Sequence, residues 1–198
     1  MEIGVIVVCL LLSAFFSGME IAFVSSNKIY LEIEKKQNSF LSKILTKLTA
    51  KPSKFIVAML IGNNIVMVIY GFFMGELLMQ WFISLGFEFS DVLSLLLQTL
   101  ISAIIVLMTA EFFPKVFFQI YANTLFKFFA IPAYFFYNVF YFISTFFIWV
   151  SDFILKNFFK TEGDNIQLYF SKVELGNYIT EQMSSVEDNE SVDCEILM

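Results

Sequence analysis

The chain has 198 residues, of which 59% are hydrophobic and 19% aromatic, with 27 phenylalanines. A soluble domain averages about 45–50% apolar residues, so this composition and a mean hydropathy of +0.78 indicate an integral membrane protein. All 12 basic residues are lysines and the net charge is −6, which argues against a nucleic-acid-binding protein. The sequence holds no histidine, which excludes catalysis by histidine.

The first apolar segment, about residues 3–25, predicts a membrane-spanning helix. It lacks a basic start and an evident cleavage site, so we interpret it as a retained span and not as a signal peptide. Three polar residues interrupt it, Ser13, Ser17 and Glu20. At about 100° per residue they fall within an arc of roughly 60° on one helix face. An ionisable group inside a bilayer is costly, which makes Glu20 a functional candidate.

A polar segment at 25–54 follows and holds seven of the twelve lysines. Lysine-rich loops stay in the cytoplasm, so the N-terminus is expected outside the cell. The second span, about 55–80, then runs outward, and the third, about 91–115, runs inward. The connection between them contains no lysine, as expected for an outer loop.

The second span contains Gly62, Asn63 and Asn64, about 12–14 Å from its inner end at 1.5 Å per residue. The asparagines have two interpretations, as cation ligands or as hydrogen-bonding groups between helices. The serines of the first span are similarly ambiguous, because a small-xxx-small pair also serves close helix packing.

The third span ends in the sequence AEFFPK. Pro114 has no backbone N–H, so the carbonyl of Ala110 loses its helical partner. That carbonyl lies beside Glu111, and together they suggest a site for a hard cation. Two alternatives remain open: Glu111 could reach to the interface, and Lys115 could pair with Glu20.

The polar groups of the three spans are hydroxyl, amide, backbone carbonyl and carboxylate oxygens at similar depths in the inner half of the membrane. Mg²⁺ and Ca²⁺ prefer such oxygen ligands, whereas zinc and copper prefer nitrogen or sulfur. Na⁺ is also compatible with this set.

The Phe-rich stretch at 116–155 is either a fourth span or helices lying at the inner membrane surface. Lysines flank and interrupt it and polar residues recur through it, which favours interfacial helices. Residues 161–198 hold nine of the eighteen acidic residues and predict an acidic helical segment. The expected fold is therefore an all-α membrane protein with a transmembrane domain at 1–160, comprising three transmembrane helices and juxtamembrane helices at about 117–158, followed by a short cytosolic acidic segment.

The motifs SAFFSGMEIAF, IGNN and AEFFPK, in this order, resemble the transmembrane domain of the CorC/CNNM (cyclin M) magnesium transporter family. The resemblance covers about residues 3–195. The family pattern has Glu-Thr-Ala where this chain has Glu20-Ile21-Ala22, and a glycine where it has Ala110. The second departure leaves less backbone freedom beside the proposed site.

The resemblance implies a homodimer of three-span subunits. We expect a multi-pass protein of the plasma membrane. The sequence has no Ser–Lys, Asp–Asp or zinc motif, which argues against an intramembrane enzyme. The resemblance also implies ATP-binding cytosolic CBS domains after the acidic segment, which this sequence does not contain. An inward-facing cavity would bind Mg²⁺ for export, with Na⁺ as a candidate coupling ion; the alternative is a Mg²⁺ sensor or scaffold that does not transport. The implied metal ligands are Ser13, Ser17, Asn63 and Glu111, with Asn64 and the Gly62 carbonyl less certain, and the implied site-shaping residues are Glu20, Ala110, Pro114 and Lys115.

Overall fold

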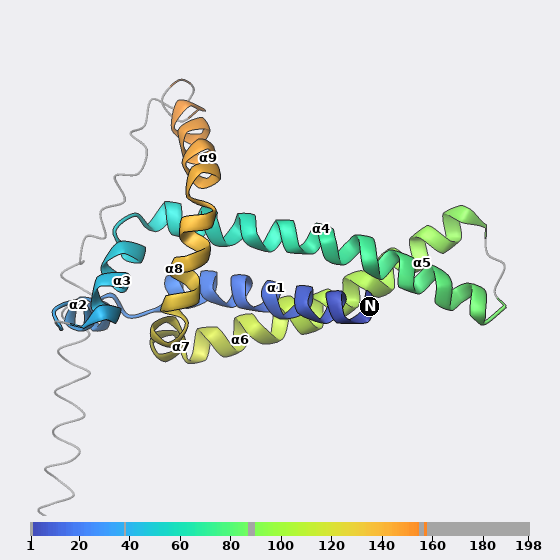
Figure 1. Cartoon of the computed structure of the whole chain (residues 1–198), viewed down its shortest axis with the longest axis horizontal. Helices are drawn as coiled ribbons and strands as arrows, with labels where there is room; N and C mark the ends of the chain where they lie inside the picture. The colour runs from blue at the N-terminus through green and yellow to red at the C-terminus, as the bar shows by residue number, and fades with distance from the viewer. Residues whose placement is uncertain (1, 38, 87–89, 155–156, 158–198) are drawn as a thin grey trace, which may run out of the picture. The chain divides into compact units, whose positions relative to one another are not determined.

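The computed structural model describes residues 2–37, 39–86, 90–154 and 157 (Figure 1). The chain divides into two compact units, Met1–Phe153 and Ile154–Met198. The described part of the first unit is built from helices joined by short connections. The predicted acidic segment at 161–198 lies outside the described residues.

Among the described residues, three helical elements are long and apolar enough to cross a membrane. They are α1 (Glu2–Ser25), α4 (Pro52–Ser84) and a third span, Asp91–Ile120. The third span is composed of α5 (Asp91–Val106), the π-helical turn η1 (Leu107–Phe112) and α6 (Phe113–Ile120). The all-helical prediction with three candidate spans is thereby confirmed. Pro52 occupies the start of α4, where its missing N–H costs no helical hydrogen bond.

The lysine-rich segment folds into two short helices that the sequence did not predict, α2 (Lys28–Lys35) and α3 (Phe40–Thr49). Each starts at a side-chain cap. The Asn27 side chain accepts hydrogen bonds from the first turn of α2, and the Ser39 hydroxyl accepts one from the Ser42 N–H. The Asn27 N–H in turn donates to the side chain of Asn123, at 2.8 Å, which ties this segment to the Phe-rich stretch.

The Phe-rich stretch forms α7 (Ala122–Phe128), α8 (Ala130–Val139) and α9 (Tyr141–Ile154). In Figure 1, α8 runs across the direction of α1 and α4, and it packs against α3 and α4. A bend of 69° separates α8 from α9, so the pair qualifies as a further span only if the two are counted as one bent element.

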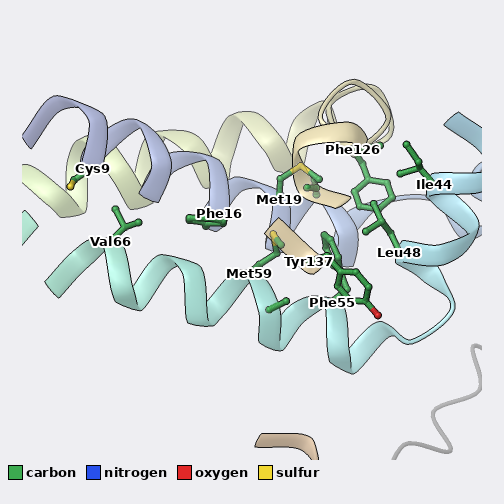
Figure 2. Close-up of a cluster of buried hydrophobic side chains, with 14 of the residues drawn as sticks. Cys9, Phe16, Met19, Ile44, Leu48, Phe55, Met59, Val66, Phe126 and Tyr137 are labelled. Atoms are coloured by element: carbon green, nitrogen blue, oxygen red, sulfur yellow. The ribbon is translucent and has the colours of Figure 1, made fainter. Parts of the chain in front are cut away.

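Aromatic and methionine side chains from α1, α4, α7 and α8 form the core near the lysine-rich end (Figure 2). The rings of Phe16 and Phe136 meet edge to face, with centroids 4.8 Å apart. Phe23 and Phe55 approach at 4.9 Å, and Phe126 closes the group at 5.8 Å from Phe55. This core holds α1 and α4 together beside the polar residues of both helices.

Candidate functional site

A hydrogen bond joins the first two spans through the predicted site residues. The Ser13 Oγ donates to the Asn63 Oδ1 at 2.6 Å, and the Ser13 side chain is buried. Hydrogen bonds between membrane helices contribute about 0.6–2 kcal/mol. The structure therefore brings Ser13 and Asn63 together, and the bond fixes the register of α1 against α4.

Ser17 lies one turn further along α1, on the same face as Ser13. Its side chain is 1% exposed, and its Oγ has no hydrogen-bond partner within the described part of the chain. Other hydroxyls of the apolar helices bond to the carbonyl four residues earlier: Thr99, Thr109, Ser144 and Thr145. A buried hydroxyl without a partner costs about 1–3 kcal/mol. Ser17 thus presents an oxygen that a bound cation or water would satisfy.

Gly62 permits the close approach of neighbouring rings at this level of α4. A Cβ added there would lie 2.8 Å from the Phe16 ring and 2.9 Å from the Phe140 ring. Gly62 is buried and precedes the half-buried Asn63, whereas Asn64 is exposed on another side of α4. The structure therefore brings Gly62 and Asn63, but not Asn64, to the interface between α1 and α4, here called the α1–α4 seam.

The third span changes its helical register beside α1. In η1, the Phe113 N–H donates to the Met108 carbonyl, five residues earlier. Pro114 has no N–H to donate. In the π register this leaves the Thr109 carbonyl, five residues earlier, without a donor, whereas in the α register it would leave the Ala110 carbonyl, four residues earlier. The sequence analysis predicted a free carbonyl at Ala110 only. Single π-helical turns are frequent at functional sites.

The two predicted site carboxylates, Glu20 and Glu111, lie on α1 and η1. Glu111 is half-buried on η1, which packs against α1, and the neighbouring Ala110 is fully buried. Glu20 is half-buried on α1, and the Lys115 ammonium lies near enough to attract its carboxylate. Among the described residues no three His, Cys, Asp or Glu side chains converge. A cation here would therefore rely on hydroxyl, amide and backbone oxygens together with a carboxylate.

Aromatic residues that the sequence analysis did not single out pack against the α1–α4 interface. The rings of Phe136 on α8 and Phe140, just after α8, stack with centroids 6.3 Å apart, and both approach Phe16. The Lys54 ammonium is buried 3.1 Å from the centre of the Tyr141 ring, a cation–π contact that attaches α9 to the start of α4. One sequence carries no signal that distinguishes these aromatic residues from those facing lipid.

Comparison with known proteins identifies the family of this chain. The family model described as the cyclin M transmembrane N-terminal domain matches residues 4–190. A "UPF0053 protein" of Haemophilus influenzae is 39% identical over 62 residues, covering 31% of this chain and 15% of that protein. A "UPF0053 protein" of Synechocystis is 35% identical over 71 residues, covering 36% and 16%. The chain thus aligns with about one sixth of the length of each relative. Because the family match spans nearly all of its residues, the chain belongs to the cyclin M (CNNM) transmembrane domain family.

Proposed function

We propose that this chain is the membrane core of a Mg²⁺ transporter, with the cation bound by residues of α1, α4 and η1. The observation that carries the proposal is the unpaired Oγ of Ser17, buried one turn from the Ser13–Asn63 hydrogen bond. The family to which the chain belongs supports magnesium as the transported ion.

The chemistry of the seam suits a partly hydrated hard cation. Mg²⁺ takes six oxygens at about 2.0–2.1 Å and retains several of its waters. Ser17, Asn63 and a free carbonyl of η1 supply neutral oxygens, and Glu111 supplies negative charge. A site with one carboxylate and several neutral ligands binds an ion strongly enough to select it and weakly enough to release it.

The proposed mechanism is alternating access. The cation enters from the lysine-rich end, where the rings of Phe136 and Phe140 cover the α1–α4 seam, and leaves toward the opposite end. We expect export from the cytoplasm, with Na⁺ entry as a candidate driving force. The proposed assembly is a homodimer whose subunits carry CBS domains in the full-length protein.

Isothermal titration of the purified chain with Mg²⁺ tests the site. Ser17→Ala and Glu111→Gln are each expected to weaken binding about tenfold, equivalent to about 1.4 kcal/mol. Ser144→Ala is the matched control, because Ser144 is equally buried but its hydroxyl bonds to the Phe140 carbonyl. Unchanged affinity in both site variants would reject the site.

Mg²⁺ flux into liposomes, with and without a Na⁺ gradient, tests transport separately from binding. We expect movement of Mg²⁺ that Ser17→Ala reduces and Ser144→Ala does not. Binding at the site without any flux would reject transport and favour a membrane-anchored sensor or scaffold.

A further inference from the structure

An apolar pocket lies between α1 and the third span, toward the Ile120 end of that span. Its volume is about 420 Å³. In Figure 1, α6 runs beside α1, and the two helices pack against each other. The walls of this hollow, here called the α1–α6 pocket, come from α1, from η1 and α6, and from the residue that follows α7. They include Ala14, Phe15, Thr109, Phe117, Phe118 and Phe129.

Aromatic contacts hold the walls of the pocket in place. The Phe118 ring lies against Gly18, where an added Cβ would be 2.5 Å from it, and it stacks on the Phe129 ring with centroids 5.6 Å apart. The Phe129 ring in turn meets Phe15 edge to face at 5.7 Å. Ala14 adds only a methyl group to this wall. The hollow therefore remains beside a small side chain, between rings that other contacts hold.

The lining of the pocket suits an apolar occupant. Among the described residues that form it, Thr109 alone has a polar side chain, and its hydroxyl already donates to the Ile105 carbonyl at 2.7 Å. A buried water needs about two to four polar partners, which phenyl rings and aliphatic groups do not supply. Neither water nor a hydrated ion therefore fits this lining.

The open side of the pocket faces the surroundings of a membrane span. Phe113 and Phe117 are exposed at its edge, and few residues in the most apolar stretch of the third span are buried. Because the chain belongs to a transmembrane family, the apolar molecules that reach this edge are lipids. An unfilled hollow would forfeit the dispersion contacts of its walls.

The size of the pocket fits a hydrocarbon chain. An apolar cavity of about 150 Å³ holds one benzene molecule, so the volume here has room for a longer hydrocarbon. Thr109 and Phe118, which both line the pocket, lie about 13 Å apart along the span at 1.5 Å per residue. A flexible chain can therefore lie lengthwise between α1 and the third span.

We propose that the α1–α6 pocket binds one acyl chain of a membrane phospholipid, which fills the space between α1 and the third span and holds the two together. Lipid elsewhere on the surface touches a helix from one side. A chain in this pocket packs between the rings of Phe15, Phe118 and Phe129, so it binds more tightly than the surrounding lipid. The inference does not depend on Mg²⁺ transport.

Tryptophan quenching by a phospholipid with brominated acyl chains tests this binding. Phe117→Trp and, as the control, Phe72→Trp are made in a Trp81→Phe, Trp149→Phe background. Phe72 is exposed on α4, outside the lining of the pocket. The whole chain is studied in a rigid sterol-type detergent, which has no flexible tail to compete.

Half-maximal quenching at position 117 should need at least about fivefold less lipid than at position 72. Equal lipid requirements would show only the ordinary contact of a helix with lipid, and they overturn the inference. Protection of position 117 from the brominated lipid in a chain that elutes as a dimer also overturns it, because a second copy then fills the pocket.

Filling the pocket from either wall tests its location. Ala14→Leu fills it from α1 and Thr109→Phe from η1, so each should remove the tight quenching at position 117. Each should also lose the rise in melting temperature that the wild type gains from added phospholipid. Ala103→Leu, at an exposed position of α5 outside the pocket, should keep both effects. Tight quenching or a full rise in melting temperature in both filled variants would place the chain elsewhere and overturn the inference.

Discussion

The first and third spans have the same mean hydropathy, 2.3, but very different burial. In the most apolar stretch of each, 44% of residues are buried in α1 and 6% in Asp91–Ile120. Apolar side chains are as stable against lipid as against another helix. Hydropathy therefore identifies both segments as spans but says nothing about which lies at the centre of the bundle.

Small and polar residues distinguish the central span. The face of α1 that packs against its neighbours carries Ser13, Ser17, Gly18 and Ala22, all buried. A Cβ added at Gly18 would lie 2.5 Å from the Phe118 ring, so this glycine lets α6 approach α1 closely. The exposed face of α5 carries leucine, isoleucine and valine instead. Close packing between membrane helices depends on such small residues.

The largest difference in stability between variants of the two spans is expected between Phe16→Ala and Phe117→Ala. Phe16 is 1% exposed on α1, and Phe117 is 58% exposed on α6. Phe16→Ala leaves a cavity among Phe136, Phe140 and α4, and should lower the free energy of unfolding by on the order of 3 kcal/mol. Phe117→Ala should lower it by less than about 1 kcal/mol, because lipid replaces the lost contacts. Thermal unfolding in the same detergent measures both, and equal losses would contradict the contrast.

The next largest loss of stability is expected from adding a methyl group at the α1–α4 interface. Gly62→Ala must displace the Phe16 and Phe140 rings, and overpacking of this kind costs about 1–3 kcal/mol. The same change at Gly4 meets open space, so Gly4→Ala should leave stability unchanged or slightly raised. Unfolding by denaturant compares the two variants. We also expect weaker Mg²⁺ binding in Gly62→Ala alone; a stable variant with normal binding would show that the seam is less tightly packed than the structure indicates.

The smallest effect concerns the segment outside the spans. Lys127 of α7 forms an ion pair with the buried Glu34 of α2, and its hydrogen bond to that carboxylate raises the pKa of Lys127. A raised pKa contributes stability at pH values below the ordinary lysine pKa of about 10.4, and this stability is lost as the pH rises through the higher folded-state value. We therefore expect a small extra loss of stability in the wild type above about pH 10.

Melting temperatures between pH 8 and 11 measure this loss against Lys127→Gln, which lacks the titrating group. The difference between the two proteins should shrink as the pH rises and as salt is added. A difference that stays constant across this range would show that the raised pKa of Lys127 does not contribute to stability.

The sequence predicted more of the site than of its surroundings. Ser13, Ser17 and Asn63 stood out because polar groups are costly in a bilayer. The structure joins Ser13 to Asn63 and buries Ser17 one turn further along α1. The predicted roles of all these residues as metal ligands stay predictions. Asn64 faces away from Asn63 because adjacent helical residues differ in direction by about 100°. Helices α2 and α3 were missed because their lysines obscured a short amphipathic pattern.

The amino-acid sequence by itself determined the number of candidate spans, the family and the oxygen-rich character of the polar residues, because hydropathy and motif spacing are local properties. The tertiary structure alone decided that α1 is central, that η1 adopts a π register just before Pro114, and that the rings of Phe136 and Phe140 pack against Phe16. These features depend on which apolar faces meet. In lipid that choice is made by shape and by a few hydrogen bonds, and a pattern of hydrophobic residues does not encode either.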